Sequence, residues 1–226
     1  MSSFLIPATS DAACRRRLIL DGIAQAARTA RRESDAVALI AVSKTHSPDE
    51  ILSLIAAGHR DFGESRVQET QAKWPVLRAR HPDLRLHLIG RLQSNKAAEA
   101  VALFDTVHSL DRVSLLKALV DAAQSVGRFP DVYVQVNIGD EEQKGGVAIE
   151  ELPALIEAVR ASPLPLAGLM AIPPKGLEPG PYFALLAKLA RRHGVTGLSM
   201  GMSADYGTAV MLGATAVRVG TALFAD

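Results

Sequence analysis

Lys44 is the first residue whose type and position suggest chemistry. It follows an apolar run that begins at Ala36, in the sequence Val42-Ser-Lys-Thr45. By the two-residue repeat of a strand, its side chain lies on the same face as that of Ile40. A lysine beside apolar walls can have a depressed pKa, and its amine can form a Schiff base with a carbonyl compound. A solvated lysine at a strand end explains the same residue, and the spacing alone favours this second interpretation.

Ser203 and Gly220, near the C-terminal end of the sequence, are candidates for holding an anion. Ser203 stands in the N-cap position of a helix predicted over 204–213, with Asp205 in its first turn. Its hydroxyl and the N–H groups of that helix can face an anion. Gly220 and Thr221 follow a predicted strand, and glycine lets the backbone approach a ligand closely. Together they favour a phosphate site, although an ordinary cap and a plain turn account for each residue alone.

The alternation of elements along the chain predicts the scaffold that positions these residues. Short apolar runs alternate with amphipathic stretches, which implies a parallel sheet. Eight such units fit an α/β fold of the TIM (β/α)8 barrel type, in which phosphate sites often use the loops after strands seven and eight. We expect one domain over residues 1–226, with a helix over Ala12–Arg32 before the barrel and a doubly wound sheet as the alternative fold. Strands are predicted at or near 37–42, 61–62, 84–89, 104–108, 132–137, 164–170, 196–199 and 216–219.

Polar residues occupy one face of several predicted strands. Tyr133, Gln135 and Asn137 oppose three valines, His87 opposes leucines, and Arg218 opposes valines. Helices outside a barrel cover the apolar face, so the polar face points into the barrel. A doubly wound sheet buries both faces against helices, where unpartnered polar groups are costly. The pattern therefore favours the barrel.

These inward polar residues need partners or a ligand. Arg218 stays charged, so it must meet an acceptor on a ligand or a carboxylate such as that of Glu64. His87 and Asn137 can touch a ligand from neighbouring strands. Alternatively, His87 is a core histidine with a backbone partner, and Asn137 closes a strand end.

Composition and motifs exclude several other functions. Lys plus Arg number 25 and Asp plus Glu 24, and the net charge of +1 argues against a strongly basic nucleic-acid binder. Cys14 is the only cysteine, which excludes a disulfide framework and a cysteine-rich zinc site. No apolar run reaches the roughly 18 residues that a membrane helix needs. The sequence also contains neither a glycine-rich motif that binds nucleotides nor the pair of histidines, four residues apart, that binds zinc in hydrolases. We expect a cytoplasmic protein with neither membrane nor nucleic acid as a partner.

Long motifs, in a fixed order from residue 37 onward, resemble those of a known family. They are Ile40-Ala-Val-Ser-Lys-Thr45, Phe62-Gly-Glu-Ser-Arg-Val-Gln-Glu69, His87-Leu-Ile-Gly-Arg-Leu-Gln-Ser-Asn-Lys96, Val136-Asn137 with Lys144-Gly-Gly146, Gly168-Leu-Met-Ala-Ile-Pro-Pro174, Leu198-Ser-Met-Gly-Met-Ser-Ala-Asp205 and Val217-Arg-Val-Gly-Thr-Ala-Leu-Phe224. The family is that of the pyridoxal phosphate homeostasis proteins. The fold that this resemblance implies is a single barrel similar to the N-terminal domain of alanine racemase.

The resemblance also implies a cofactor, pyridoxal 5'-phosphate (PLP), and roles for the candidate residues. It implies that Lys44 holds PLP as a Schiff base, that Arg218 faces the pyridine nitrogen, and that Ser203, Gly220 and Thr221 hold the phosphate. His87 and Asn137 remain candidates for further contacts with the cofactor.

This sequence departs from the family pattern at two of these motifs. Ser65 stands where the family usually has an asparagine, so an amide contact beside the cofactor is missing. Leu86 replaces a tryptophan often found before the histidine.

The expected function is that of a monomeric, non-catalytic PLP carrier that buffers the aldehyde and releases it to apo-enzymes. Racemisation needs two acid/base groups on opposite faces of the carbanion, and Lys44 supplies only one. Arg218 at the pyridine nitrogen also disfavours protonation there, which weakens the ring as an electron sink. The alternatives are a PLP-dependent racemase or decarboxylase, for which Tyr133 is the first residue to suspect as a second base, and a barrel that binds another phosphorylated metabolite.

Overall fold

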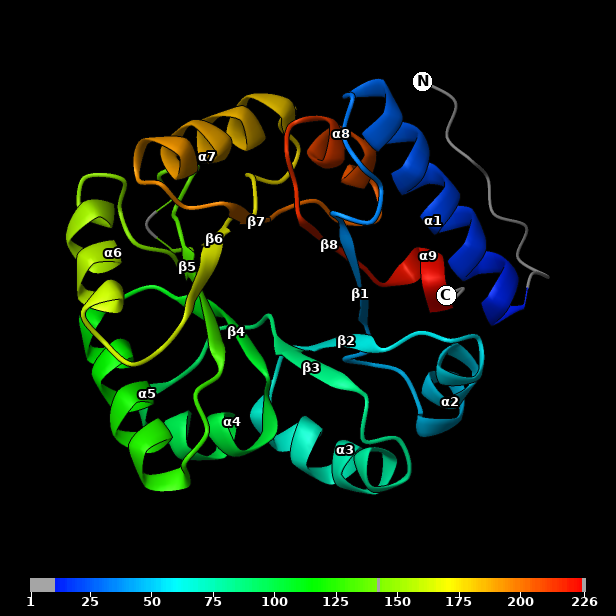
Figure 1. Cartoon of the computed structure of the whole chain (residues 1–226), viewed down its shortest axis with the longest axis horizontal. Helices are drawn as coiled ribbons and strands as arrows, with labels where there is room; N and C mark the ends of the chain where they lie inside the picture. Colours follow the sequence, from blue (N-terminus) through cyan, green and yellow to red (C-terminus); the bar gives the residue numbers. More distant parts are fainter. Residues whose placement is uncertain (1–10, 142, 225–226) are drawn as a thin grey trace.

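Eight parallel strands close into a barrel, and their order in space is their order along the chain (Figure 1). The computed structural model describes residues 11–141 and 143–224. The strands are β1 (Ala38–Val42), β2 (Asp61–Glu64), β3 (Arg85–Leu88), β4 (Thr106–Leu110), β5 (Asp131–Gln135), β6 (Leu166–Met170), β7 (Gly197–Ser199) and β8 (Ala216–Val219). The predicted barrel is confirmed, and the doubly wound alternative is wrong because β8 pairs with β1 and closes the sheet.

Helices surround the barrel and connect successive strands. They are α1 (Ala12–Thr29), α2 (Pro48–Ala56), α3 (Val67–Arg80), the 3₁₀ turn η1 (Ser94–Lys96), α4 (Ala97–Leu103), α5 (Val113–Val126), α6 (Leu152–Arg160), α7 (Gly180–Arg192), α8 (Tyr206–Met211) and α9 (Thr221–Phe224). The N-terminal helix α1 occupies the part of this ring between α8 and α2, and it packs against α8, α9 and α2 (Figure 1). None of the helices in the described ranges is long and apolar enough to cross a membrane.

Local sequence signals explain where these elements begin and end. The helix α2 starts with a capping box, in which Ser47 accepts from the backbone of Glu50 and the Glu50 carboxylate accepts from the backbone of Ser47. Pro48 at the first helical position has the φ angle that a helix needs. Gly58, just after this helix, has a φ of +82°. This left-handed conformation favours glycine and ends the helix.

The two faces of the strands differ as the alternation predicts. Leu86, Leu88, Val132 and Val217 point outward and join one apolar core with the surrounding helices. Residues of the opposite parity, such as Arg218, point into the barrel. The interior therefore carries polar side chains that need partners within the barrel or on a ligand.

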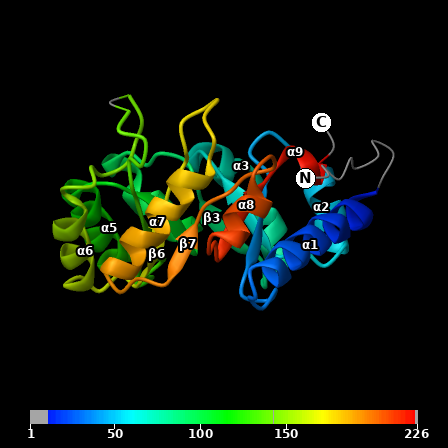
Figure 2. The same ribbon diagram turned by 90° about the horizontal axis from the view of Figure 1, so that it is seen from above.

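The loops that follow the strands gather at one end of the barrel. In the side view, the loops after β5 and β6 project from the same face (Figure 2). The short helix α9 also lies toward this face. Since active sites of such barrels lie at the carboxyl ends of the strands, this is the end where we look for a site.

Candidate functional site

The carboxyl ends of β1 and β8 bring Lys44 and Gly220 to the same region. These strands are neighbours in the closed barrel, with Ile40 paired with Arg218. Lys44 lies two residues beyond the end of β1, in a turn, with its side chain exposed. A Cβ atom on Gly220 would lie 3.4 Å from the carbonyl oxygen of Val42, so the two strand ends are in contact. Lys44 and Gly220, which are far apart in the sequence, therefore follow strand ends that lie side by side.

The turn that carries Lys44 is anchored by the buried carboxylate of Glu64. Its Oε1 accepts from the Ser43 hydroxyl at 2.8 Å and from the Trp74 indole N–H at 2.9 Å, and it lies 2.7 Å from the Lys73 Nζ. Lys73 also donates to the backbone oxygen of Ser43 at 2.8 Å. These bonds tie the end of β1 to β2 and α3. The residue before Lys44 is therefore held rigidly, while the Lys44 amine itself reaches the surface.

Removal of the Lys73 amine is expected to destabilise the fold. In Lys73→Met the Glu64 carboxylate, which has no exposed surface, keeps two hydrogen bonds but loses its counter-ion. We expect a loss of about 2 kcal/mol in the free energy of unfolding, measured by urea denaturation. Lys117→Met, on the exposed face of α5, is the matched control and is expected to change stability little. Equal stability of the two variants would contradict the anchoring role of this ion pair.

Ser203 and Gly220 form the candidate anion cradle. The Gly220 N–H donates to the Ser203 Oγ at 3.3 Å, across loops that follow β7 and β8. Ser203 accepts this bond, so its own hydroxyl proton can be donated to an anion. Thr221, which starts α9, is exposed beside them.

One part of the prediction for Ser203 is wrong. The N-cap of α8 is Asp205, two residues later, and Ser203 lies in the turn before it. The Asp205 carboxylate accepts from the Met202 N–H at 2.6 Å, which folds this turn so that Ser203 faces Gly220. The serine therefore belongs to the cradle through a loop and not through a helix end.

Arg218 is a buried cation whose acceptors are neutral. Only 4% of the residue is exposed. It donates through Nη1 to the Ser199 hydroxyl at 2.6 Å and through Nη2 to the Ala171 carbonyl at 3.1 Å. Burial lowers its pKa to about 10, while the charge of Asp205 acts in the opposite direction. The alternative that Arg218 pairs with Glu64 is wrong, because Glu64 is bound to Lys73.

His87 and Asn137 have their polar atoms engaged by the protein. The two ring nitrogens of His87 lie 3.0 Å from the His108 Nε2 and 3.1 Å from the Asp61 Oδ1. The Asn137 amide donates to the Glu141 carbonyl at 3.1 Å and accepts from the Glu141 N–H at 3.2 Å. Asn137 thus closes the turn after β5, as one of its two interpretations predicts. His87 has side-chain partners rather than the backbone partner of its alternative.

Two interior residues that sequence reasoning left without a site role, His108 and Ser199, join this region. The His108 Nδ1 forms a hydrogen bond with the Ser199 hydroxyl at 2.9 Å. The His108 ring also stacks on the Tyr133 ring, with the ring centroids 4.5 Å apart. Space for the Tyr133 ring exists because residue 168 is glycine, where a Cβ atom would lie 2.5 Å from the ring. A histidine and a serine at inward positions were the available signal. Their mutual contact requires the closed barrel, since β4 and β7 are not neighbours.

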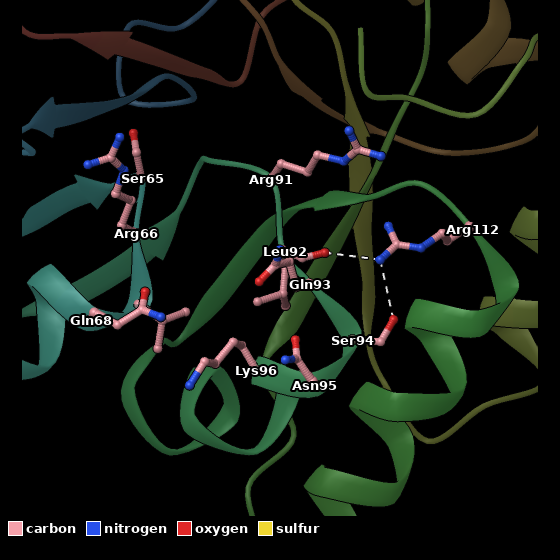
Figure 3. A pocket seen from close by; sticks show the side chains of 11 residues that line it. Ser65, Arg66, Gln68, Arg91, Leu92, Gln93, Ser94, Asn95, Lys96 and Arg112 are labelled. Atoms are coloured by element: carbon pink, nitrogen blue, oxygen red, sulfur yellow. Dashed lines mark hydrogen bonds between the residues drawn. The ribbon is translucent and has the colours of Figure 1, made fainter. Parts of the chain in front are cut away.

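Two cavities lie among the loops at the same end of the barrel. One of about 300 Å³ is lined by Asn137, Lys144 and Arg91, among others. The other, of about 690 Å³, lies between the loops after β2, β3 and β4, and none of the predicted cofactor residues lines it (Figure 3). Arg112, at its edge, donates to the Leu92 carbonyl at 3.1 Å and to the Ser94 hydroxyl at 3.3 Å (Figure 3).

In the part of the chain that the structure describes, no metal site lies beside these organic contacts. Within residues 11–141 and 143–224, no three histidine, cysteine, aspartate or glutamate side chains are grouped so that they could bind one. The donors at the strand ends are an amine, hydroxyls, a backbone N–H and a guanidinium. Such a set suits an anionic ligand with a carbonyl group.

Comparison with known proteins identifies the family. The sequence model described as "Alanine racemase, N-terminal domain" matches residues 19–226. A pyridoxal phosphate homeostasis protein of Pseudomonas aeruginosa is 43% identical over 211 residues, which cover 89% of this chain and 90% of that protein. The chain belongs to the family of pyridoxal phosphate homeostasis proteins. Another member, from Escherichia coli, is 38% identical over 223 residues and is matched over 92% of its length.

Solved structures of the protein PipY and of an alanine racemase share the fold. PipY of Synechococcus elongatus, solved with PLP bound, is 41% identical, with a TM-score of 0.77 and coverage of 89% of this chain and 99% of that chain. An alanine racemase of Clostridium difficile has a TM-score of 0.70 at 16% identity, and this chain covers 55% of its length. The second likeness is one of fold alone. The curated relatives are named for homeostasis of the cofactor and not for a catalysed reaction.

Proposed function

We propose that this homeostasis protein binds PLP at the ends of β1, β7 and β8 and carries it without turnover of a substrate. The observation that carries the proposal is the convergence of three kinds of group. An exposed amine on Lys44, a hydroxyl and N–H cradle at Ser203 and Gly220, and the buried Arg218 cation come together from distant parts of the sequence. The bound PLP of the related PipY supports the choice of ligand.

The donor set of this chain fits PLP. Among the described residues no side chain bonds the Lys44 amine, whereas the amines of Lys96 and Lys144 lie 3.0 and 2.6 Å from glutamate oxygens. The hydrogen bonds of Arg218 to Ser199 and Ala171 use two of the five N–H groups of its guanidinium. Gly220 leaves its backbone open where a side chain would cover it.

Each residue has a role that follows from its chemistry. When bound, PLP supplies an aldehyde carbon that a primary amine attacks reversibly. Lys44 holds that carbon, and the exposed position of its amine lets the ligand enter and leave. Ser203, Gly220 and Thr221 hold the phosphate through charge-assisted hydrogen bonds, and Arg218 faces the ring nitrogen.

The position of Tyr133 supports a carrier over a racemase or decarboxylase. Its hydroxyl bonds to Thr215, the residue before β8 begins, so it points away from the carboxyl ends of the strands. Burial also raises its pKa, which keeps the phenol protonated at neutral pH. Tyr133 is therefore badly placed to be the second base that the alternative function needs.

Transfer of the cofactor is the direct test of the carrier function. PLP-loaded protein is expected to restore activity to an apo-PLP-enzyme, while it racemises and decarboxylates no common amino acid. The matched control is the Lys44→Ala protein treated with PLP and desalted in the same way. Turnover of an amino acid that disappears in both Lys44→Ala and Tyr133→Phe would establish a two-base enzyme instead. We further propose that the carrier acts as a monomer in the cytoplasm, with apo-PLP-enzymes as its partners.

A further inference from the structure

A chain of hydrogen-bonded side chains crosses the barrel interior and ends at Arg218. It runs from Arg218 Nη1 to Ser199 Oγ (2.6 Å), then to His108 Nδ1 (2.9 Å), and from His108 Nε2 to His87 Nδ1 (3.0 Å). The last link joins His87 Nε2 to the Asp61 Oδ1 at 3.1 Å. The residues come from β8, β7, β4, β3 and β2, so the link between β4 and β7 passes through the middle of the barrel.

The two ends of this chain fix the direction of every hydrogen bond between them. A guanidinium can only donate, so the Ser199 oxygen accepts from Arg218 and its own proton goes to His108 Nδ1. A carboxylate can only accept, so the proton of neutral His87 must sit on Nε2, facing Asp61. His87 Nδ1 is then an acceptor and takes the Nε2 proton of His108. Both neutral imidazoles therefore have one defined tautomer, and all four bonds point from the cation toward the anion.

Protonation of His87 would break this order. A protonated His87 donates from both nitrogens, which forces His108 to donate toward Ser199. The Ser199 oxygen would then receive hydrogen bonds from both sides, and its own proton would lose its acceptor. His108, at the centre of the chain of hydrogen bonds, is neutral. Full burial and the nearby charge of Arg218 keep its pKa well below its usual value.

The far end of the chain is negatively charged under the same conditions. Burial raises the pKa of Asp61, but the hydrogen bond from His87 and the charge of Arg85 lower it, and the net effect is a lowered pKa. Arg85 lies 3.8 Å from the Asp61 carboxylate on the side of solvent. Asp61 thus remains an acceptor at neutral pH and fixes the direction of the chain.

We propose that Asp61, His87, His108 and Ser199 are positioning residues that hold the Arg218 guanidinium, in a fixed orientation, toward the ring nitrogen of the cofactor. A buried arginine without a carboxylate beside it needs acceptors to stay in one place. Ser199 supplies one acceptor, and the chain behind it prevents the serine hydroxyl from turning its proton toward Arg218. The proposal rests on the proposed function of PLP binding and adds how this chain controls one side of that site.

The tautomers can be tested without the cofactor. In protein labelled with ¹⁵N and studied at pH 8, long-range proton–nitrogen spectra are expected to show His87 and His108 protonated on Nε2 alone, with the two signals assigned through His87→Gln and His108→Gln. Asp61→Asn can donate as well as accept, so it is expected to give His87 a mixture of tautomers. A proton on Nδ1 of either histidine in the unsubstituted protein would overturn the proposed direction.

The effect on the cofactor is tested with two buried serines. Ser199→Ala removes the acceptor of Arg218, while Ser109→Ala on β4 removes a buried hydroxyl that bonds nothing among the described residues. We expect Ser199→Ala to weaken PLP binding by about tenfold and to shift the visible absorption band of the bound cofactor. Ser109→Ala is expected to change neither.

The outcomes separate this inference from the proposed function. Equal affinity and equal spectra for PLP bound to Ser199→Ala and Ser109→Ala would overturn the positioning role while PLP binding stands. If the unsubstituted protein fails to bind PLP, the proposed function is overturned, and so is the role of these residues in cofactor binding. The tautomer measurement still reports whether the hydrogen bonds of the chain have the derived direction.

Discussion

Replacing Lys44 with alanine is expected to abolish covalent attachment of PLP and to weaken its binding at least about a hundredfold, or by about 2.7 kcal/mol. Lys44 places a primary amine, which can bond the aldehyde carbon, at the end of β1, whereas the phosphate contacts lie on the loops after β7 and β8. Weak binding through the phosphate therefore remains. The measurement is a PLP titration followed by visible absorbance, in which the band of the lysine-bound cofactor is expected to be missing.

The exposed position of Lys44 makes this substitution a clean test. Its side chain makes no hydrogen bond to the described part of the protein, so the variant is expected to unfold at the same urea concentration as the original. Lys188→Ala, which removes an exposed lysine from α7, is the matched control and is expected to bind PLP normally. An unchanged absorbance band in Lys44→Ala would show that another amine holds the cofactor.

Pyridoxal, which lacks the phosphate, is expected to bind about a hundredfold more weakly than PLP, or by a larger factor. Each charge-assisted hydrogen bond contributes about 1.5–3 kcal/mol. Since the Gly220 N–H already donates to Ser203, the hydroxyls of Ser203 and Thr221 are the two donors that the cradle offers to the phosphate. Competition between the two aldehydes for the protein, measured by equilibrium dialysis, gives the ratio. Equal affinities would remove the phosphate cradle from the account.

Substitutions in the cradle test whether its residues act on PLP binding and not on the stability of the fold. In Gly220→Ala the new methyl group meets Val42 at ordinary van der Waals distance, so the protein is expected to fold normally but to bind PLP more weakly. Gly207→Ala on α8, where nothing lies within 4 Å of the added atom, is the matched control. Ser203→Ala and Ser114→Ala form a second such pair, of which the latter alters only an exposed residue on α5. Both cradle variants, Gly220→Ala and Ser203→Ala, are expected to weaken the binding of PLP more than the binding of pyridoxal.

The barrel could be predicted from the sequence because each of its strands and helices is a local pattern. The strand β8 begins and ends at the predicted residues, and the other strands begin or end within a few residues of their predicted bounds. The alternation of valines with Tyr133 and Gln135 distinguishes a barrel from a doubly wound sheet, because only a barrel has an interior. The helix α9 was not predicted, since four residues carry no periodicity.

The candidate site could be predicted only in its backbone positions. The predicted strand ends lead us to expect that Lys44, Ser203 and Gly220 lie at the same end of the barrel, because parallel strands in a closed barrel end on the same side. The partners of the side chains depend on contacts between strands that are distant in sequence. The Ser199–His108 bond and the loop that displaces Ser203 from the N-cap are both of this kind.

The central claim is that Lys44 is the residue that carries the cofactor, and reductive trapping tests it most directly. The PLP-loaded protein is treated with borohydride, digested and analysed by mass spectrometry for lysines that bear the reduced cofactor. The account predicts a single modified site, at Lys44. Modification at Lys96 or Lys144 instead, or no modified lysine in protein that retains PLP, would contradict it.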